Sequence, residues 1–264
     1  MKTPYATTLF DPDATPCPAV ARYLDFVDYE AEVPVHTHRK GQLIIALYGA
    51  VTCRAENEIW IVPPHCAVWI PGGIPHSAKA TWNAHLNYLF IEPGAAALPD
   101  RCCTLAISPL IKELVDRLTR ESVDYPPDSH VARLTRVTLD ELATMPQQNF
   151  SLPVSAHPKI RAMADALVSH PEDRSTFKEW AKQLALSERS LARLMLRETG
   201  LTFGRWRQQL HLIIALQELA SGVSVQNVGG KLGYESVNAF ITMFRKAMGS
   251  TPAHYFSERK TGAH

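Results

Sequence analysis

Four side chains in the first third of the chain have the types and the spacing of a metal site. Two histidines, His36 and His38, are followed by Gln42 four positions later and by His76 further along the chain. Neutral imidazole suits Zn, Fe, Ni and Cu, and an amide oxygen can complete such a site. His36, His38, Gln42 and His76 are therefore candidate ligands for a divalent metal ion. The alternative is a polar pocket for an organic effector, in which these histidines only make hydrogen bonds.

The spacing of these residues resembles the two sequence motifs of the cupin barrel. The matching positions are His36, His38, Gln42, Gly49, Pro71, Gly73 and His76. In cupins, two histidines, a glutamate and a later histidine hold the metal, and here Gln42 stands in place of the glutamate. The exchange removes one negative charge, which weakens the attraction for a cation.

A second group of residues, near the C-terminus, belongs to a pattern that occurs twice. Shifting the chain by 49 positions places Ser187 on Ser236 and Gly200 on Gly249. A serine can accept hydrogen bonds from the first-turn amides of a helix, and a glycine suits the left-handed turn that ends one. Each copy therefore predicts a helix of about three turns.

Both of these helices have one apolar and one outward face, and each follows a shorter helix. The apolar faces consist of Leu191, Leu194 and Met195 in the first copy and of Phe240, Met243 and Phe244 in the second. Thr176 and Glu179 form a capping box for the first shorter helix, and Ser224 caps the second. This pattern describes a helix-turn-helix, so we predict two such units, at 176–197 and 224–247.

About 100 residues at the C-terminus resemble the DNA-binding domain of the AraC/XylS family of transcription regulators. The resemblance is carried by Ser187, Leu191, Arg193, Met195, Arg197 and Gly200, and by Leu232, Gly233, Tyr234, Phe240, Phe244, Arg245, Lys246, Gly249 and Pro252. It implies sequence-specific binding of double-stranded DNA. The family often has an arginine where this chain has Thr242 and an alanine where it has Gly229, with Gly230 alongside. The two glycines predict a second helix-turn-helix unit that is less stable than the first, and Thr242 in place of arginine predicts weaker contacts with bases.

The outward faces of the two longer helices carry side chains that can read base edges. Arginine can bond guanine O6 and N7 together, and asparagine can make the equivalent contact with adenine. The residues expected to read bases are Arg189, Ala192, Arg193, Val237, Asn238, Ile241 and Thr242. Those expected to bind phosphates are Ser187, Arg197, Arg205, Arg207, Ser236, Arg245 and Lys246. The helix between the units, 203–221, would be roughly 28 Å long, close to the ~34 Å of one DNA turn.

The net charge of +1 conceals an uneven distribution. Residues 157–264 contain 15 Lys and Arg and 9 Asp and Glu, whereas residues 1–156 contain 12 and 17. The basic C-terminal half can approach phosphates. Five cysteines without a C-x-x-C pair predict reduced thiols. No apolar run is long enough to span a bilayer and no signal-peptide pattern begins the chain, which predicts a cytoplasmic protein.

Short apolar runs separated by prolines and glycines predict strands of a small barrel or sandwich in the N-terminal half. The runs are 42–48, 51–54, 58–62, 66–70 and 85–91. The aromatic residues on these strands are expected in the core or in the lining of the barrel, and they are Tyr48, Trp60, Trp69, Trp82, Tyr88 and Phe90.

From about residue 108 the pattern becomes helical. Ser108 caps one helix, and a second follows the turn at 125–128. In the AraC/XylS family such a helical pair is the dimerisation element, so the resemblance implies a homodimer; packing within one chain is the alternative. The predicted domains are a cupin-like barrel at 1–105, the helical pair at 106–145, a linker at 146–156 and the DNA-binding domain at 157–264.

The expected fold class is therefore α+β with several domains, a cupin-like β-barrel with a helical pair and an all-α domain. The expected function is transcription regulation, as activator or repressor, by a barrel that senses a small molecule or a metal (Zn, Fe or Ni). RNA polymerase is a further expected partner, and the resemblance implies control of a neighbouring transporter gene. No enzymatic activity is expected.

Two other classes of function remain as alternatives. A metal-dependent cupin enzyme would use His36, His38 and His76, and would need an open coordination position and a general base or oxidant. A helical adaptor would bind protein instead of DNA, and its binding would lack the salt dependence of phosphate contacts.

Overall fold

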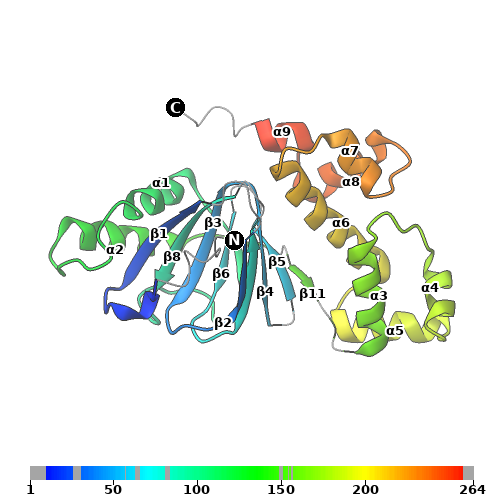
Figure 1. Cartoon of the computed structure of the whole chain (residues 1–264), viewed down its shortest axis with the longest axis horizontal. Coiled ribbons are helices and arrows are strands. Elements are labelled where there is room, and N and C mark those ends of the chain that lie inside the picture. The colour runs from blue at the N-terminus through cyan, green and yellow to red at the C-terminus, as the bar shows by residue number, and fades with distance from the viewer. Residues whose placement is uncertain are drawn as a thin grey trace, which may run out of the picture. The chain divides into compact units, whose positions relative to one another are not determined.

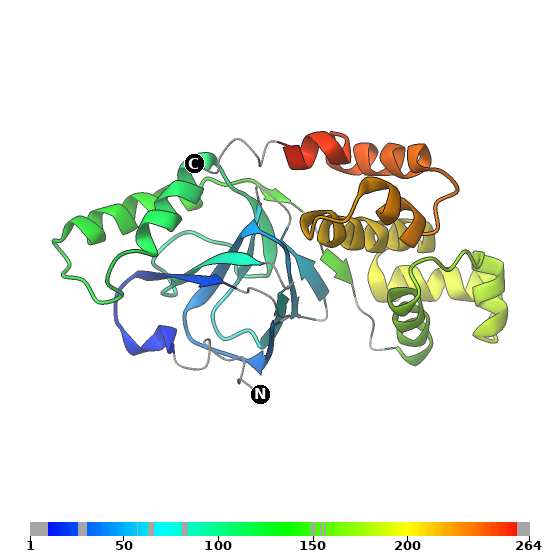
Figure 2. The same cartoon turned by 45° about the horizontal axis from the view of Figure 1, so that its top comes forward.

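The computed structural model describes residues 10–25, 31–56, 58–62, 66–80, 84–148, 151–153, 155 and 157–257. The chain forms two compact units, Met1–Ser151 and Leu152–His264 (Figures 1 and 2). This boundary lies within the predicted linker, of which residues 149–150, 154 and 156 are outside the described part. No helix among the described residues is long and apolar enough to cross a membrane.

Two sheets of antiparallel strands form the first unit (Figure 1). The six-stranded sheet has the order β1-β8-β3-β6-β9-β10, and the five-stranded sheet has the order β11-β5-β4-β7-β2. The strands are β1 (Ala19–Asp25), β2 (Ala31–His36), β3 (Gly41–Tyr48), β4 (Val51–Ala55), β5 (Glu58–Ile61), β6 (Cys66–Ile70), β7 (His76–Ala80), β8 (His85–Ile91), β9 (Cys103–Ala106), β10 (Gln147–Gln148) and β11 (Ser151–Pro153). A short 3₁₀ turn, Pro12–Ala14, precedes β1.

The core of the first unit has two parts, one between the sheets and one on the outer face of the six-stranded sheet. Alternate residues of β3 contribute to each part, because Ile44 and Ala46 pack between the sheets while Leu43 and Ile45 pack on the outer face. The first six residues of β3 are all buried. A strand covered on both faces gives a continuous apolar run, which is why this run was readable in the sequence.

Helices α1 (Pro109–Leu118) and α2 (His130–Leu142) cover that outer face (Figure 1). Each begins at a serine, Ser108 or Ser129, whose hydroxyl accepts a hydrogen bond from an amide three residues later. The buried sides of the two helices add Ile111, Val115, Leu118, Leu139 and Leu142 to the core.

All five predicted strand runs are observed, with ends that move by one residue at most. Three of the aromatic residues, Trp60, Tyr88 and Phe90, lie in the core between the sheets. Trp69 packs instead on the outer face, beneath the helices. The expectation of an interior position is wrong for Tyr48, which is 48% exposed because it ends its strand. Trp82 lies outside the described residues.

The second unit is helical throughout its described residues, apart from the short end of β11. Its helices are α3 (Pro158–Ser169), α4 (Phe177–Gln183), α5 (Glu188–Thr199), α6 (Phe203–Ala220), α7 (Val225–Lys231), α8 (Val237–Met248) and α9 (Pro252–Ser257). In Figure 2, α6 runs between the group that contains α3 to α5 and the group that contains α7 to α9. The predicted fold class, an antiparallel β half followed by a helical half with two helix-turn-helix units, is confirmed.

Candidate DNA-reading surface and histidine cluster

Helices α5 and α8 begin and end where the duplicated pattern predicts. The hydroxyls of the capping serines, Ser187 and Ser236, accept hydrogen bonds from amides three residues later, at 3.1 and 3.2 Å. Gly200 and Gly249 end the helices with φ angles of 68° and 77°. Glycine adopts this left-handed conformation without the strain that a Cβ brings. Local main-chain chemistry therefore sets the length of both helices.

Each of these helices buries one face and exposes the other. Leu191 and Met195 of α5 and Phe240 and Phe244 of α8 are at most 1% exposed. On the opposite face, the exposed base-reading candidates are Arg189, Ala192, Arg193, Asn238 and Thr242, and the half-buried ones are Val237 and Ile241. The inner faces hold the helices in the unit, so the outer faces are available to a partner.

The shorter helices that precede α5 and α8 are also fixed by local contacts. At the start of α4, the Thr176 hydroxyl accepts from the Glu179 amide at 3.3 Å, and the Glu179 carboxylate accepts from the Thr176 amide at 2.6 Å. The bond from the Thr176 amide, followed by one from the Thr176 hydroxyl, lowers the pKa of the Glu179 carboxyl group. After α7 the chain turns at Gly233, where φ is 73° and a Cβ would lie 2.7 Å from the Glu172 carbonyl oxygen.

The candidate phosphate ligands differ in how free they are. The exposed ones are Ser187, Arg197, Arg205, Ser236, Arg245 and Lys246. Arg197 is already paired with Glu198, with Nε and Nη2 each 3.0 Å from Oε1. Arg207 is half-buried, donates to the Ser175 carbonyl at 2.9 Å and lies 4.7 Å from the centre of the Phe203 ring. Burial lowers the pKa of Arg207. A phosphate contact would require Arg207 to leave these partners.

In the first unit, the three predicted histidine ligands lie together. His36 ends β2 and His76 begins β7, and the two residues are direct partners in the antiparallel register. The centres of the His36 and His76 rings are 4.3 Å apart, and His38 adds distances of 5.0 Å to His76 and 5.7 Å to His36. One nitrogen of each ring lies within 4.8 Å of the others.

Gln42 and a glycine turn complete the surroundings of this cluster. The Gln42 Oε1 atom lies 3.0 Å from the His38 Nε2 atom. The Gly73 amide donates to the His38 carbonyl at 2.8 Å, and a Cβ on Gly72 would lie 1.9 Å from the Arg39 carbonyl oxygen. Only a residue without a side chain permits this approach, which brings the start of β7 to the end of β2.

The three imidazoles differ in their exposure. His76 is only 2% exposed, whereas His36 and His38 are half-buried. Burial, and then the nearness of His36 and His38, lowers the pKa of His76 to about 4. His76 is therefore neutral near pH 7, the state in which imidazole binds metals. The chemistry of the cluster fits a divalent transition metal.

A buried charge next to the histidines was not predicted. Lys40 has no solvent exposure, and its Nζ donates to the Thr15 carbonyl at 2.5 Å and lies 3.1 Å from the Glu92 carboxylate. The amides of Arg39 and Lys40 donate to the Asp13 carboxylate at 2.6 and 3.0 Å. Burial lowers the pKa of Lys40. These contacts hold the segment before β1 against the turn that contains His38.

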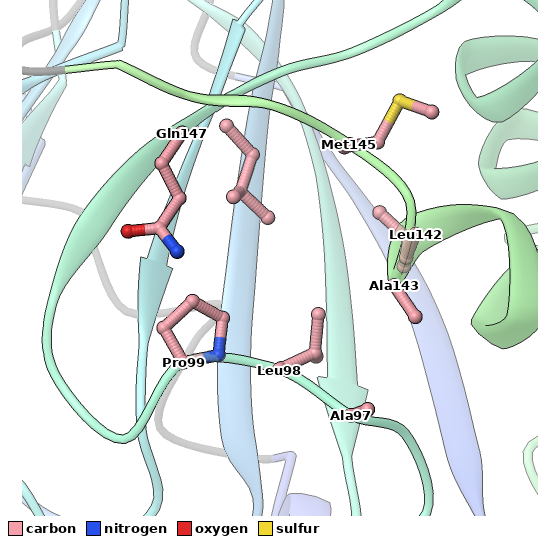
Figure 3. Close-up of a pocket in the computed structure, with 8 residues that line it drawn as sticks. Ala97, Leu98, Pro99, Leu142, Ala143, Met145 and Gln147 are labelled. Atoms are coloured by element: carbon pink, nitrogen blue, oxygen red, sulfur yellow. The ribbon is translucent and has the colours of Figure 1, made fainter.

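A separate pocket of about 270 Å³ lies beside the C-terminal end of α2 (Figure 3). It is lined by Ala97, Leu98, Pro99, Leu105, Leu142, Ala143, Met145 and Gln147. This lining has no titratable side chain, so the pocket offers the Gln147 amide, main-chain polar groups and apolar side chains, and no charged group.

Comparison with known proteins identifies both halves of the chain. Residues 23–130 match the model of the AraC-like ligand binding domain, and residues 180–258 match that of a helix-turn-helix domain. The chain is 50% identical to the HTH-type transcriptional regulator NimR of Escherichia coli strain K12 over 252 residues, which are 96% of this chain and 92% of NimR. It is 33% identical to the HTH-type transcriptional regulator RipA of Corynebacterium glutamicum over 103 residues, 39% of this chain and 31% of RipA.

Two solved structures show weaker similarity. ToxT from Vibrio cholerae O395 has a TM-score of 0.40 and 9% identity over 93% of this chain and 98% of its own. The DNA-binding domain of AdpA in complex with a target DNA has a TM-score of 0.36 and 25% identity over 38% of this chain and 91% of its own. The identity to NimR over nearly the whole length, with the two domain matches, shows that the chain belongs to the AraC/XylS family of helix-turn-helix transcription regulators.

Proposed function

We propose that this regulator reads double-stranded DNA by inserting α5 and α8 into successive major grooves. The observation that carries the proposal is the division of each helix into a buried inner face and an exposed outer face. The connecting helix α6 has 18 residues and spans about 27 Å at 1.5 Å per residue. This length is near the ~34 Å of one DNA turn, so the two helices can meet one side of the duplex.

Base reading is assigned first to the polar side chains exposed on the first two turns of these helices. Arg189 and Arg193 of α5 form no ion pair within the described part of the chain, so their guanidinium groups are free to meet guanine. Asn238 of α8 offers the bidentate contact to adenine. Ala192, Val237, Ile241 and Thr242 supply apolar or small contacts to neighbouring base edges.

Phosphate binding is assigned to the exposed cations and to the helix starts. Arg205, Arg245 and Lys246 are exposed on α6 and α8. The first-turn amides behind Ser187 and Ser236 also attract phosphate oxygens. Arg197 must exchange its pair with Glu198 for a phosphate, and Arg207 must leave Ser175.

The proposal is tested by fluorescence anisotropy with the full chain and two DNA duplexes of equal length. One duplex is taken from the region upstream of its own gene or of a neighbouring transporter gene, and the other is a shuffled sequence. We expect a preference of at least about 1,000-fold for one natural segment, and an affinity that falls steeply with salt. Equal affinity for natural and shuffled DNA would contradict the proposal.

We also propose that the regulator is a homodimer joined through α1 and α2. Leu110 of α1 is 51% exposed and Val137 of α2 is 48% exposed, although the other sides of these helices are buried. Covering such apolar side chains against a second copy removes them from water. A dimer presents two DNA-binding domains to one promoter.

The barrel serves in this proposal as the sensor that controls DNA binding. A small molecule or a metal ion bound there changes the affinity for the promoter, and the barrel carries out no reaction. From a site beside the promoter, the bound regulator contacts RNA polymerase. It acts in the cytoplasm, the compartment that holds the DNA of a bacterium.

A further inference from the structure

We infer that the histidine cluster is a binding site for one divalent transition-metal ion, with the Nε2 atoms of His36, His38 and His76 as ligands. The Gln42 side chain lies beside them as a further oxygen donor. The inference deepens the proposed function, because it assigns a ligand to the sensor barrel. It depends on the geometry of the first unit alone.

Each of the three rings uses Nδ1 for a hydrogen bond to a main-chain carbonyl. Nδ1 of His36 lies 2.9 Å from the Pro34 carbonyl oxygen, and Nδ1 of His76 lies 2.8 Å from that of Ile74. Nδ1 of His38 contacts the carbonyl oxygen of Lys40 at 2.5 Å. A carbonyl only accepts, so each Nδ1 carries the hydrogen and, in the neutral ring, each Nε2 carries the lone pair. The His38 Nε2 and Gln42 Oε1 atoms, 3.0 Å apart, are then two acceptors without a donor between them, and a cation there would satisfy both. Metal-binding histidines are oriented in this same way by a second partner.

A cluster of histidines that only satisfy one another would need a different arrangement. His76 is 2% exposed, and its Nε2 has no hydrogen-bond partner within the described chain. The neighbouring rings present lone pairs of their own, so they cannot donate to it. A buried polar atom without a partner is unfavourable. One cation at the centre satisfies all three nitrogens at once.

The size of the cluster agrees with an ion of this class. Zn–N bonds are about 2.0–2.1 Å long, which separates ligand nitrogens by roughly 3.3 Å around a tetrahedral ion. One nitrogen of each ring lies within 4.8 Å of the others. Side-chain rotations of about an ångström therefore close the set around a metal, without movement of β2 or β7.

The donor types select the kind of metal. Three imidazoles and an amide, with no carboxylate in the set, favour Zn²⁺, Ni²⁺, Co²⁺ or Cu²⁺ over Mg²⁺ and Ca²⁺, which prefer oxygen ligands. All four donors are neutral, so the bound ion keeps its full charge. His36 and His38 are half-buried, which leaves the ion reachable from solvent.

The site is connected to the segment before β1 through His38. Its Nδ1 bonds to the Lys40 carbonyl, and the amides of Arg39 and Lys40 hold the Asp13 carboxylate. An ion that fixes the His38 ring therefore stiffens the turn that holds this segment. Slower hydrogen exchange of the Arg39 and Lys40 amides is an independent readout of occupancy, and it does not involve DNA.

The test is isothermal titration of the full chain, without a histidine tag and after chelator treatment, with Zn²⁺ and separately with Ni²⁺. We expect one ion per chain and slower exchange at Arg39 and Lys40. His36→Ala and His38→Ala should each weaken metal binding at least about 10-fold. Removing the hydrogen-bond partner behind a metal-binding histidine already has an effect of this size, and removing the ligand itself should have at least the same effect. His130→Ala, which removes an exposed histidine of α2 outside the cluster, is the matched control and should leave binding unchanged. Gln42→Glu should bind the ion more tightly, because it adds a negative charge beside it.

His36 and His38 are chosen for the test because both are half-buried, whereas His76→Ala would leave a cavity in the core. Circular dichroism of His36→Ala and His38→Ala checks that both variants are folded. Unchanged stoichiometry and affinity in the His36→Ala/His38→Ala double variant would show an adventitious ion only and would overturn the inference, as would failure of the wild-type chain to bind. A chain that selects its DNA but binds no metal contradicts this inference alone. A chain that binds one ion but shows no DNA preference contradicts only the proposed function.

Discussion

Substitution of Arg193 tests whether this residue recognises bases or only adds to the general affinity for DNA. Its side chain is exposed on α5, and the nearby Glu198 carboxylate is occupied by Arg197 and Ser155. Arg193→Ala should cost about 1–3 kcal/mol on the preferred site and little on shuffled DNA. Lys246→Ala should weaken both and reduce the salt slope by about 1. Anisotropy titrations at several salt concentrations measure both quantities, and equal losses for Arg193→Ala on the two DNAs would refute its base-reading role.

Arg205 and Arg207 lie two residues apart on α6 and allow a comparison of an exposed arginine with one that makes contacts within the domain. Arg207 donates to the Ser175 carbonyl and lies over Phe203, whereas Arg205 is exposed. Arg207→Ala should lower the free energy of unfolding by about 1–2 kcal/mol through the lost charged hydrogen bond. Arg205→Ala should leave stability unchanged and weaken DNA binding. Urea denaturation of the two variants measures the difference; equal midpoints would mean that Arg207 is as free as Arg205.

At this scale, the sequence predicts contacts within a few residues and misses those between distant segments. The caps at Ser187 and Ser236 and the box of Thr176 and Glu179 were predictable, because each joins residues three positions apart. The burial of Lys40 was not, because its partners Thr15 and Glu92 come from other parts of the chain. The histidines were recognisable by type and spacing, but their shared tautomer depends on backbone carbonyls that the sequence does not place.

Helix α7 contains two adjacent glycines that should respond differently to the same substitution. Gly230 is exposed and no atom lies within 4 Å of a Cβ built on it, whereas a Cβ on Gly229 would lie 3.4 Å from Phe240. Gly230→Ala should stabilise α7 by about 0.5–1 kcal/mol through helix propensity. Gly229→Ala should gain less, because it also presses on the Phe240 side chain. Hydrogen exchange of α7 peptides compares them, and reduced protection in Gly230→Ala would be the contrary result.

Among the strands, the sequence signal depended on residue type as well as burial, since β4 and β7 share one burial pattern and only β4 was predicted. β3 and β8 were predicted because both faces are covered and their apolar runs are continuous. β7, with the sequence HSAKA, has small and polar residues and gave no signal, although it carries His76. Its pairing with β2 also includes a shift between Val33 and His36. The sequence therefore grouped the three histidines without predicting the strand that aligns His76 with His36.

For the whole molecule, the proposed dimer is tested through its exposed apolar side chains. The Leu110→Glu/Val137→Glu double variant should weaken self-association at least about 10-fold, equivalent to about 1.4 kcal/mol, because charges replace the side chains that pair. Lys112→Glu alters the charge on another face of α1 and serves as the control. Sedimentation velocity over a range of concentrations gives the dissociation constants. A wild-type chain that sediments as a monomer, or a double variant as dimeric as wild type, would rule out this interface.

The claim that the chain reads DNA with two helices on one side of the duplex is tested most directly by hydroxyl-radical footprinting. The full chain is bound to its preferred upstream segment, and cleavage is compared for wild type, Arg193→Ala and Asn238→Ala. We predict two protected segments about 10 base pairs apart on one face, of which Arg193→Ala weakens the first and Asn238→Ala the second. Protection without a preferred position, or a single protected segment that both variants affect equally, would contradict the account.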